Sequence, residues 1–179
     1  MAITFFNENG GIDYVENRVT FAEGVYRVDD EWSYKEFDTI DQVIEHFRAV
    51  DGEVNDFADV AYIDMQEVNE LRNVDVKKII EEDDDYDEDE GVEVGSVTLM
   101  YKLPFEVTFE IKDNCVDFKV VDECGTMIIK GNAKTIEESC NEICEVMNTK
   151  HRLSKLGERF EIDEDDIEEY DDNVYVCSL

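Results

Sequence analysis

Several residue types are scarce in this chain, and each scarcity excludes a class of protein. The 179 residues include one proline, two histidines and one tryptophan. A single proline argues against long proline-rich linkers. Two histidines leave little material for histidine-based catalysis or for a histidine-rich metal site. No apolar run approaches the roughly 20 residues that a membrane-spanning helix needs, so no membrane partner is expected.

Basic residues are also scarce. Sixteen Lys and Arg face 49 Asp and Glu, which gives a net charge of -33. A field of this sign repels phosphate and argues against direct nucleic-acid binding. The one basic cluster (Lys150, Arg152, Lys155 and Arg159) is followed at once by acidic residues. Solubility needs a net charge of magnitude only about 2–8 in a small domain. The excess therefore indicates a cationic partner, bound cations or a high-salt habitat, and the clustering of the acids disfavours the last.

Two acidic runs dominate the sequence. Nine of the ten residues from Glu81 to Glu90 are acids, as are nine of the twelve from Glu161 to Asp172. Each run contains a tyrosine that could stack on or anchor a partner, and Ile162, Ile167 and Tyr170 are expected to pin the second run to the core. The candidate partner-binding residues are Glu81, Glu82, Asp83, Asp84, Asp85, Tyr86, Asp87, Glu88, Asp89, Glu90, Glu161, Asp163, Glu164, Asp165, Asp166, Glu168, Glu169, Tyr170, Asp171 and Asp172.

The acids and thiols do not match the known metal-binding spacings. Asp85, Asp87 and Asp89 alternate as in a calcium-binding EF-hand loop, but Glu90 stands where that loop needs glycine and Ser96 where it needs glutamate. The five cysteines lack the tight pairs of structural zinc sites. They are Cys115, Cys124, Cys140, Cys144 and Cys177. Small buried hydrophobic residues are the favoured interpretation, and neither a metal nor another cofactor is expected.

Catalytic and targeting motifs are missing from the sequence. It contains no glycine-rich phosphate loop, no nucleophile elbow and no His-Glu-x-x-His pattern, so we expect no enzyme. The start of the chain turns polar at Asn7 and does not read as a signal peptide. We therefore expect a cytoplasmic protein with reduced thiols.

The apolar patterning predicts an α+β fold in which two antiparallel β-meanders are each followed by a capped helix. In the first half we expect a hairpin of Ile3–Phe6 and Ile12–Val15 around Asn9-Gly10-Gly11. Thr39 and Gln42 form a capping box, and a helical region from about residue 64 to 82 breaks near Asn73. The other expected strands are Arg18–Phe21, Val25–Val28, a period-two stretch through Trp32, Tyr34 and Phe37, and Phe57–Ile63.

The second half is expected to repeat this plan. Thr135 and Glu138 form a second capping box, and Ile136, Cys140, Ile143 and Met147 form the apolar stripe of the helix that follows. The expected strands are Val92–Leu103, Phe105–Lys112, Val116–Val121, Met127–Lys130 and a closing strand at Asn173–Cys177. The predicted division is residues 1–80, an acidic junction at 81–91, and residues 92–179.

In physical type, this chain resembles the phage-encoded acidic DNA mimics of the anti-restriction and anti-CRISPR classes. The resemblance rests on size, on charge and on the runs Glu81–Glu90 and Glu161–Asp172. Duplex DNA carries one charge per about 1.7 Å, so 33 net charges match roughly 55 Å of duplex.

This resemblance implies an inhibitor that enters the DNA-binding channel of a basic nucleic-acid-binding protein. A single-effector CRISPR nuclease in an infected bacterial host is the favoured target, and a restriction nuclease is another. An acidic chaperone or binding module for basic proteins, such as histones or ribosomal proteins, is the alternative. A calcium-buffering protein is a third interpretation.

Overall fold

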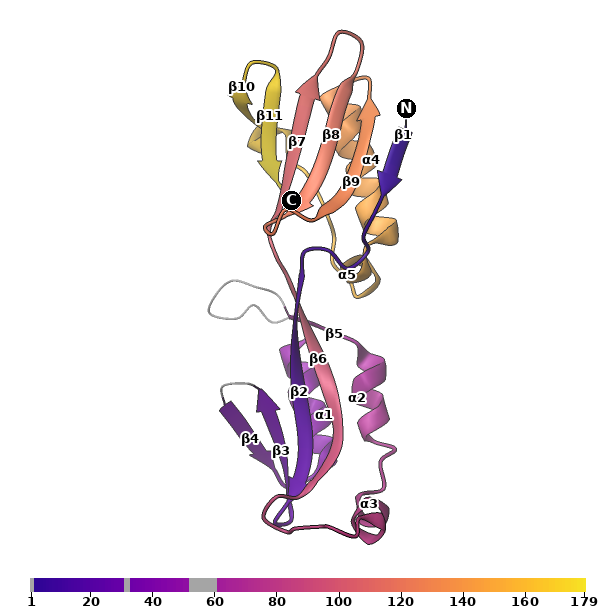
Figure 1. The fold of residues 1–179 in the computed structure, drawn as a ribbon, viewed down its shortest axis with the longest axis vertical. Helices are drawn as coiled ribbons and strands as arrows, with labels where there is room; N and C mark the ends of the chain where they lie inside the picture. The colour runs from indigo at the N-terminus through magenta and orange to yellow at the C-terminus, as the bar shows by residue number, and fades with distance from the viewer. Residues whose placement is uncertain (1, 31–32, 52–60) are drawn as a thin grey trace. The chain divides into compact units, whose positions relative to one another are not determined.

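The computed structural model describes residues 2–30, 33–51 and 61–179 (Figure 1). Helices and two antiparallel sheets together confirm the predicted α+β class. The chain forms two compact units. The central unit is Tyr14–Tyr101, and the terminal unit combines Met1–Asp13 with Lys102–Leu179. This division differs from the predicted one at 81–91. The long strands β2 (Ile12–Ala22) and β6 (Val92–Lys102) are neighbours in one sheet, so the residues between them in sequence belong to the same unit.

The central unit has a five-stranded sheet in the order β4-β3-β2-β6-β5. Its first three strands form the predicted meander, with the β2–β3 turn at Glu23 and Gly24. Both turn residues have positive φ (53° and 84°), as a type I′ hairpin turn requires. The strands are β2 (Ile12–Ala22), β3 (Val25–Asp30), β4 (Ser33–Phe37), β5 (Ala61–Ile63) and β6 (Val92–Lys102).

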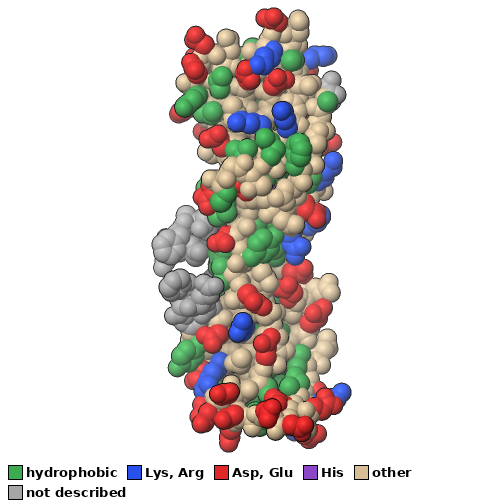
Figure 2. All heavy atoms as spheres, viewed as in Figure 1, with side chains coloured by type: hydrophobic (Ala, Val, Ile, Leu, Met, Phe, Trp, Pro, Cys, Tyr) green, Lys and Arg blue, Asp and Glu red, His purple; other side chains and the backbone are tan. Residues whose placement is uncertain are grey.

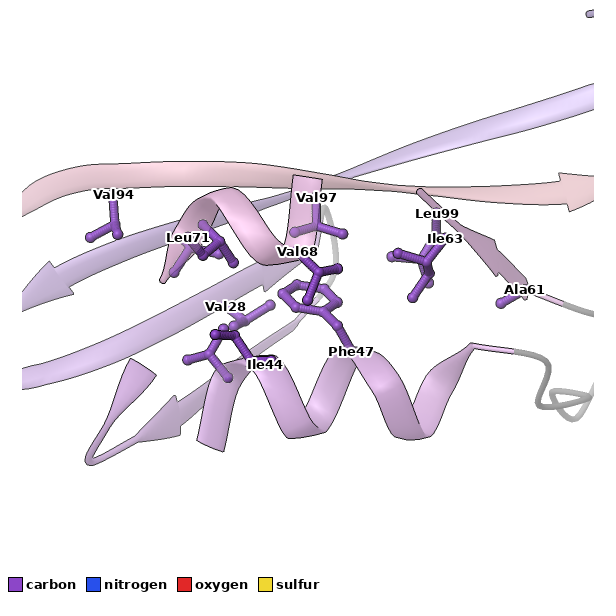
Figure 3. Close-up of a cluster of buried hydrophobic side chains, with 12 residues drawn as sticks. Val28, Ile44, Phe47, Ala61, Ile63, Val68, Leu71, Val94, Val97 and Leu99 are labelled. Carbon is purple, nitrogen blue, oxygen red and sulfur yellow. The ribbon is translucent and has the colours of Figure 1, made fainter. Parts of the chain in front are cut away.

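Helices α1 (Ile40–Val50) and α2 (Met65–Leu71) supply the other side of this unit's core. The capping box of Thr39 and Gln42 is confirmed, with both reciprocal hydrogen bonds present. The helical region predicted over 64–82 is interrupted as expected, by residues 72–75 between α2 and α3 (Val76–Glu82). Figure 3 shows Phe47 of α1 directed toward Val68 of α2 and Val97 of β6. Trp32 and residues 57–60, which carried other predictions, lie outside the described residues.

The terminal unit has a six-stranded antiparallel sheet in the order β1-β9-β8-β7-β11-β10. Helix α4 (Ile136–Lys150) packs against β8 and β9, and the short α5 (Arg152–Lys155) follows it. The predicted meander of β7, β8 and β9 and the closing strand β11 are all present. The strands are β1 (Ala2–Phe5), β7 (Phe105–Ile111), β8 (Val116–Asp122), β9 (Met127–Ala133), β10 (Glu168–Asp171) and β11 (Val174–Ser178).

The first strand of each predicted half lies in the sheet of the other unit. The hairpin predicted from Ile3–Phe6 and Ile12–Val15 is wrong, because β1 pairs with β9, where Phe5 lies opposite Ile129. Likewise β6 does not begin the second meander. It lies between β2 and β5 and buries Val97 in the core of the central unit.

The N-terminus of α4 departs in one detail from the predicted capping box. The Thr135 hydroxyl accepts the backbone N–H of Glu138 at 3.1 Å, as expected. The Glu138 carboxylate, however, accepts the N–H of Lys134 at 3.0 Å, one residue before the predicted donor. The predicted apolar stripe is confirmed by burial of Cys140, Ile143 and Met147.

Candidate functional site: two acidic surfaces

The first acidic run folds into a series of turns that follows α3. Glu81 and Glu82 are the last residues of α3, and Asp83 is its C-cap. The Asp83 carboxylate accepts the backbone N–H of Asp85 at 3.1 Å. The Asp87 carboxylate accepts that of Asp89 at 2.9 Å in the same way. Such Asx turns fix the local backbone, so the run has a defined conformation.

The same run is attached to the β2–β3 hairpin of the central unit. The backbone N–H of Glu23 donates to the carbonyl of Glu88 at 3.3 Å. Gly91, with φ of +73°, closes the run, and a Cβ there would lie 2.4 Å from the carbonyl oxygen of Phe21. A glycine is therefore required where the run meets β2. Figure 2 shows Asp and Glu side chains gathered at the end of the central unit where α3 lies in Figure 1.

The second acidic run forms two ordered elements in the terminal unit. A short 3-10 helix, η1 (Glu164–Asp166), is capped by Asp163, whose carboxylate accepts the N–H of Asp165 at 3.0 Å. The run then forms β10, which pairs with β11 across a turn containing Asn173 at a φ of 62°. The prediction of a closing strand anticipated β11 but not the acidic strand β10 that pairs with it.

The segment that begins the second run lies along α4. The Asn148 side chain donates to the carbonyl of Phe160 at 2.8 Å and accepts its N–H at 2.9 Å. Further along, the Cys144 thiol lies against the backbone N–H of Ile162. Sequence reasoning missed Asn148, because an asparagine inside a helix carries no signal of a distant backbone partner.

Helix α4 adds its own acids to this surface. Glu137, Glu138 and Glu145 are exposed on the helix. Asn148 and Cys144 of the same helix contact the segment that leads into the exposed acids from Glu161 onward. We name the exposed acids of α4 and of residues 161–172 together the α4 acidic surface. Its charges are held by a helix, a 3-10 turn and a hairpin, so their spacing is set by regular backbone geometry.

Three thiols lie beneath the α4 acidic surface. Burial, together with the neighbouring thiols and Glu164, raises the pKa of Cys140 to about 12. Burial likewise raises the pKa of Cys177 to about 11, and it raises the pKa of Cys144 above its ordinary value. None of the three forms a disulfide. They are therefore protonated at neutral pH and pack as small hydrophobic groups. Within the described residues, no group of three or more His, Cys, Asp or Glu is arranged to hold a metal ion.

All predicted carboxylates of both runs are exposed, but the two tyrosines differ in their exposure to solvent. Tyr170 on β10 is 78% exposed, whereas Tyr86 is half-buried. The expectation that Tyr170 pins the second run to the core is therefore wrong, and only Ile162 and Ile167 are half-buried there. Because β10 is an edge strand with exposed side chains, Tyr170 is free to contact a partner.

The two predicted runs belong to different units of the structure. The first run belongs to the central unit and the second to the terminal unit. No helix among the described residues is long and apolar enough to cross a membrane. Comparison of the chain with protein-family models, with curated proteins and with solved structures finds no match.

Proposed function

We propose that this chain is an acidic nucleic-acid mimic that inhibits a DNA-binding enzyme by occupying its nucleic-acid channel. Within that class we propose a defence nuclease as the target, with a single-effector CRISPR nuclease favoured over a restriction enzyme. The observation that supports the proposal is that the backbone of both acidic runs is ordered. Their carboxylates are exposed, and the backbone that carries them is fixed by turns, by η1 and by the β10–β11 hairpin.

Fixed charges suit a mimic for a physical reason. A DNA channel carries Lys and Arg at positions set by phosphate spacing. An inhibitor whose acids already have a fixed spacing loses little conformational entropy when it binds such a channel. Its net charge of -33 also steers it toward a basic partner and accelerates association.

An acidic chaperone for basic proteins would use its charge differently. Binding many partners is served by flexible surfaces that adapt to each of them. The turns of the first run and the hairpin of the second do not have that character. The ordered backbone of the two runs therefore favours the mimic over the chaperone.

The proposal can be tested by competition for DNA. A fluorescent duplex of about 30 base pairs is bound to each of several purified enzymes, including guide-loaded single-effector CRISPR nucleases and restriction nucleases. Addition of this protein should release the duplex from one enzyme at near-equimolar concentration, and rising salt should weaken the release. If no enzyme in the panel loses DNA at low salt, the mimic proposal is wrong. Equally tight binding to histones, ribosomal proteins and the nucleases would instead indicate the chaperone.

Two charge-matched variants identify the surface that contacts the target. The first replaces four exposed acids of the second run whose side chains cap no backbone N–H: Glu161→Gln, Glu164→Gln, Asp165→Asn and Glu169→Gln. The second replaces four comparable acids of the first run: Glu81→Gln, Asp84→Asn, Glu88→Gln and Glu90→Gln.

Both variants lose the same charge, so long-range steering falls equally in the two. Each exposed carboxylate that meets a Lys or Arg contributes about 0.2–1 kcal/mol. Four lost contacts therefore weaken binding by about 1–4 kcal/mol, or roughly 5-fold to 1000-fold. We expect the larger loss from the first variant, because the second run is extended by the glutamates of α4. Equal losses would show that net charge alone acts and would contradict a shaped contact.

A further inference from the structure

The sheet of the terminal unit has two unlike edges. One edge is β10, where Glu168, Glu169 and Asp171 are exposed and the pairing with β11 shifts register. Charged side chains and bulges are the usual means by which an edge strand is kept from pairing with another chain. The opposite edge is β1, which has the sequence Ala-Ile-Thr-Phe and carries no charge. It has none of these protections.

The other edges among the described strands are also protected. Strand β4 in the central unit carries exposed Lys35 and Glu36. Strand β5 is only three residues long, and all three are buried. Of the described edges, β1 is therefore the one suited to receive a further strand.

The register of β1 shows which of its backbone groups are open. Phe6 donates its N–H to the carbonyl of Ile128 at 2.9 Å, so these opposite residues form a hydrogen-bonded pair. Such pairs alternate along an antiparallel ladder. Thr4 and Lys130 form the next hydrogen-bonded pair, and the N–H and C=O groups of Ile3 and Phe5 point away from β9. These are the groups that an added strand would bind.

Lysines lie close to this edge on both faces of the sheet. On the face of the sheet that α4 does not cover, Thr4 lies opposite Lys130, and Lys130 lies opposite Lys119 on β8. On the other face, the Lys150 ammonium lies 5.9 Å from the centre of the Phe5 ring.

These lysines have no acidic partner in the described part of the chain. No carboxylate there lies within ion-pair distance of Lys119, Lys130 or Lys150. Two ammonium groups directly opposite each other, such as those of Lys119 and Lys130, destabilise a sheet. Their position is unexpected in a chain with 49 acids available to pair with them.

We propose that the open edge of β1 is a docking site for an extended acidic segment of a partner protein. The segment adds to the sheet as a seventh strand through the backbone groups of Ile3 and Phe5. Its acidic side chains meet Lys130 on one face and Lys150 on the other. An added strand lies two strand spacings, about 10 Å, from β9, a distance that a lysine and a glutamate side chain span together. This site is separate from the acidic surfaces and takes a partner of the opposite charge.

A second copy of this chain fits the edge less well. Pairing of β1 with another β1 would leave Lys130 and Lys150 of both copies without counter-charges, because β1 carries no acidic residue. Charge complementarity therefore favours a separate acidic partner.

The test uses a synthetic eight-residue peptide with the repeat Val-Val-Glu-Glu and blocked ends, which places glutamates on both faces of the added strand. Its binding is measured by fluorescence anisotropy, and the Ile3 and Phe5 amides are followed by hydrogen exchange. The peptide should bind at least about 10-fold more tightly than its Val-Lys counterpart, and it should slow exchange of both amides. Lys130→Glu should weaken binding about 5-fold to 30-fold, whereas Lys35→Glu on β4 should leave it unchanged. Ile3→Pro, which removes an outward N–H, should abolish binding.

Three results would overturn this assignment. They are equal binding of the Val-Glu and Val-Lys peptides, unchanged exchange at Ile3 and Phe5, and a dimer in which those amides are protected without peptide. The Lys130→Glu variant keeps the test decisive if Ile3→Pro fails to fold. None of these results depends on the DNA competition assay, so the two proposals can fail separately.

Discussion

Replacement of His151 tests how the terminal unit is held together. The His151 ring is fully buried and packs edge-on against Phe105 and Phe160, with ring centres 5.6 and 5.1 Å away. Its Nδ1 accepts the N–H of Leu153 at 3.3 Å, so the ring proton is on Nε2, which donates to the carbonyl of Gly10 at 2.9 Å. The neutral ring thus links the α4–α5 junction to the N-terminal segment.

Protonation of His151 removes this arrangement. Burial lowers the pKa of His151 below 6.5, and the Lys102 and Lys155 ammonium groups lower it further, against the hydrogen bond to Gly10 and the Glu8 carboxylate. The unfolded chain therefore binds a proton at a higher pH than the folded chain. The stabilisation is complete above pH 6.5 and is lost as the pH falls from 6.5 toward the folded-state pKa. The slope of this loss is at most about 1.4 kcal/mol per pH unit.

The variant His151→Gln separates this effect from the titration of the carboxylates. Glutamine can still donate to Gly10 but does not titrate. We expect it to destabilise the terminal unit by about 1–3 kcal/mol at pH 7.5, through lost packing and a lost acceptor for Leu153. Between pH 6.5 and 5.5 the difference from the parent should shrink by up to about 1.4 kcal/mol.

The measurement is native-state hydrogen exchange of buried amides in β7 and β8, which report on the terminal unit alone. Exchange is recorded for the parent and for His151→Gln at pH 7.5, 6.5 and 5.5. Carboxylates common to both proteins cancel in the comparison. A difference that stays constant across this range would refute the conclusion that a buried neutral His151 supports the unit.

The remaining predictions concern backbone support and the exposed aromatic residue. Asp122→Ala leaves three backbone N–H groups without their acceptor. It should lower the free energy of unfolding, measured by urea denaturation, by about 2–5 kcal/mol. Gly11→Ala places a Cβ 2.2 Å from the Phe105 ring at a φ of +67° and should cost about 2–4 kcal/mol; Gly125→Ala, at a φ of +79° in open space, should cost about 1–2 kcal/mol in the same assay. Tyr170→Ser should change thermal stability by less than about 0.5 kcal/mol and weaken target binding about 10-fold in the DNA competition assay.

Local patterns predicted the helices α1, α2, α3 and α4 and most strands of this fold, but not α5 or η1. Thr39 and Gln42 mark the start of α1 because capping depends on residues three positions apart. Asn73 marked the interruption between α2 and α3 for a similar reason, since such breaks are local. Alternation along Phe105–Ile111 predicted both the strand β7 and its buried face, because side chains alternate between the two faces of a sheet.

Strand pairing was not predictable in the same way. Ile3–Phe6 and Ile12–Val15 flank a strong turn signal, yet β1 pairs with β9, where Phe5 meets Ile129 from the far part of the sequence. The turn Asn9-Gly10-Gly11 instead leads the chain away from β1, and the N–H of Gly11 is held by the buried carboxylate of Asp122. A single sequence contains no signal for such distant pairs, so the exchange of strands between the two units could not be read from it.

The sequence located the acidic runs, but it did not predict that their backbone is ordered. Runs of like charge ordinarily repel and stay disordered. Here Asp83, Asp87 and Asp163 each accept a backbone N–H two residues later, so part of the charge is stabilised by backbone donors. The signal for this was present as Asp-x-Asp spacing, which is also what any acidic run contains by composition. Only the positions of Gly91 and Asn173, where the backbone takes positive φ, distinguish ordered turns from a solvated tail.

The ordered backbone of the runs affects how they would bind a cationic partner. Each carboxylate that does not accept a backbone N–H remains repelled by its neighbours in the free protein, and a cationic partner relieves that repulsion when it binds. A flexible run would already have relieved it by spreading apart, and it would lose conformational entropy on binding. A run held in place by Asp83, Asp87 and Asp163 gains the full electrostatic relief without that entropic loss. The same bonds that keep like charges together in the free chain therefore favour a partner whose own charges are fixed, as they are in a channel built for nucleic acid.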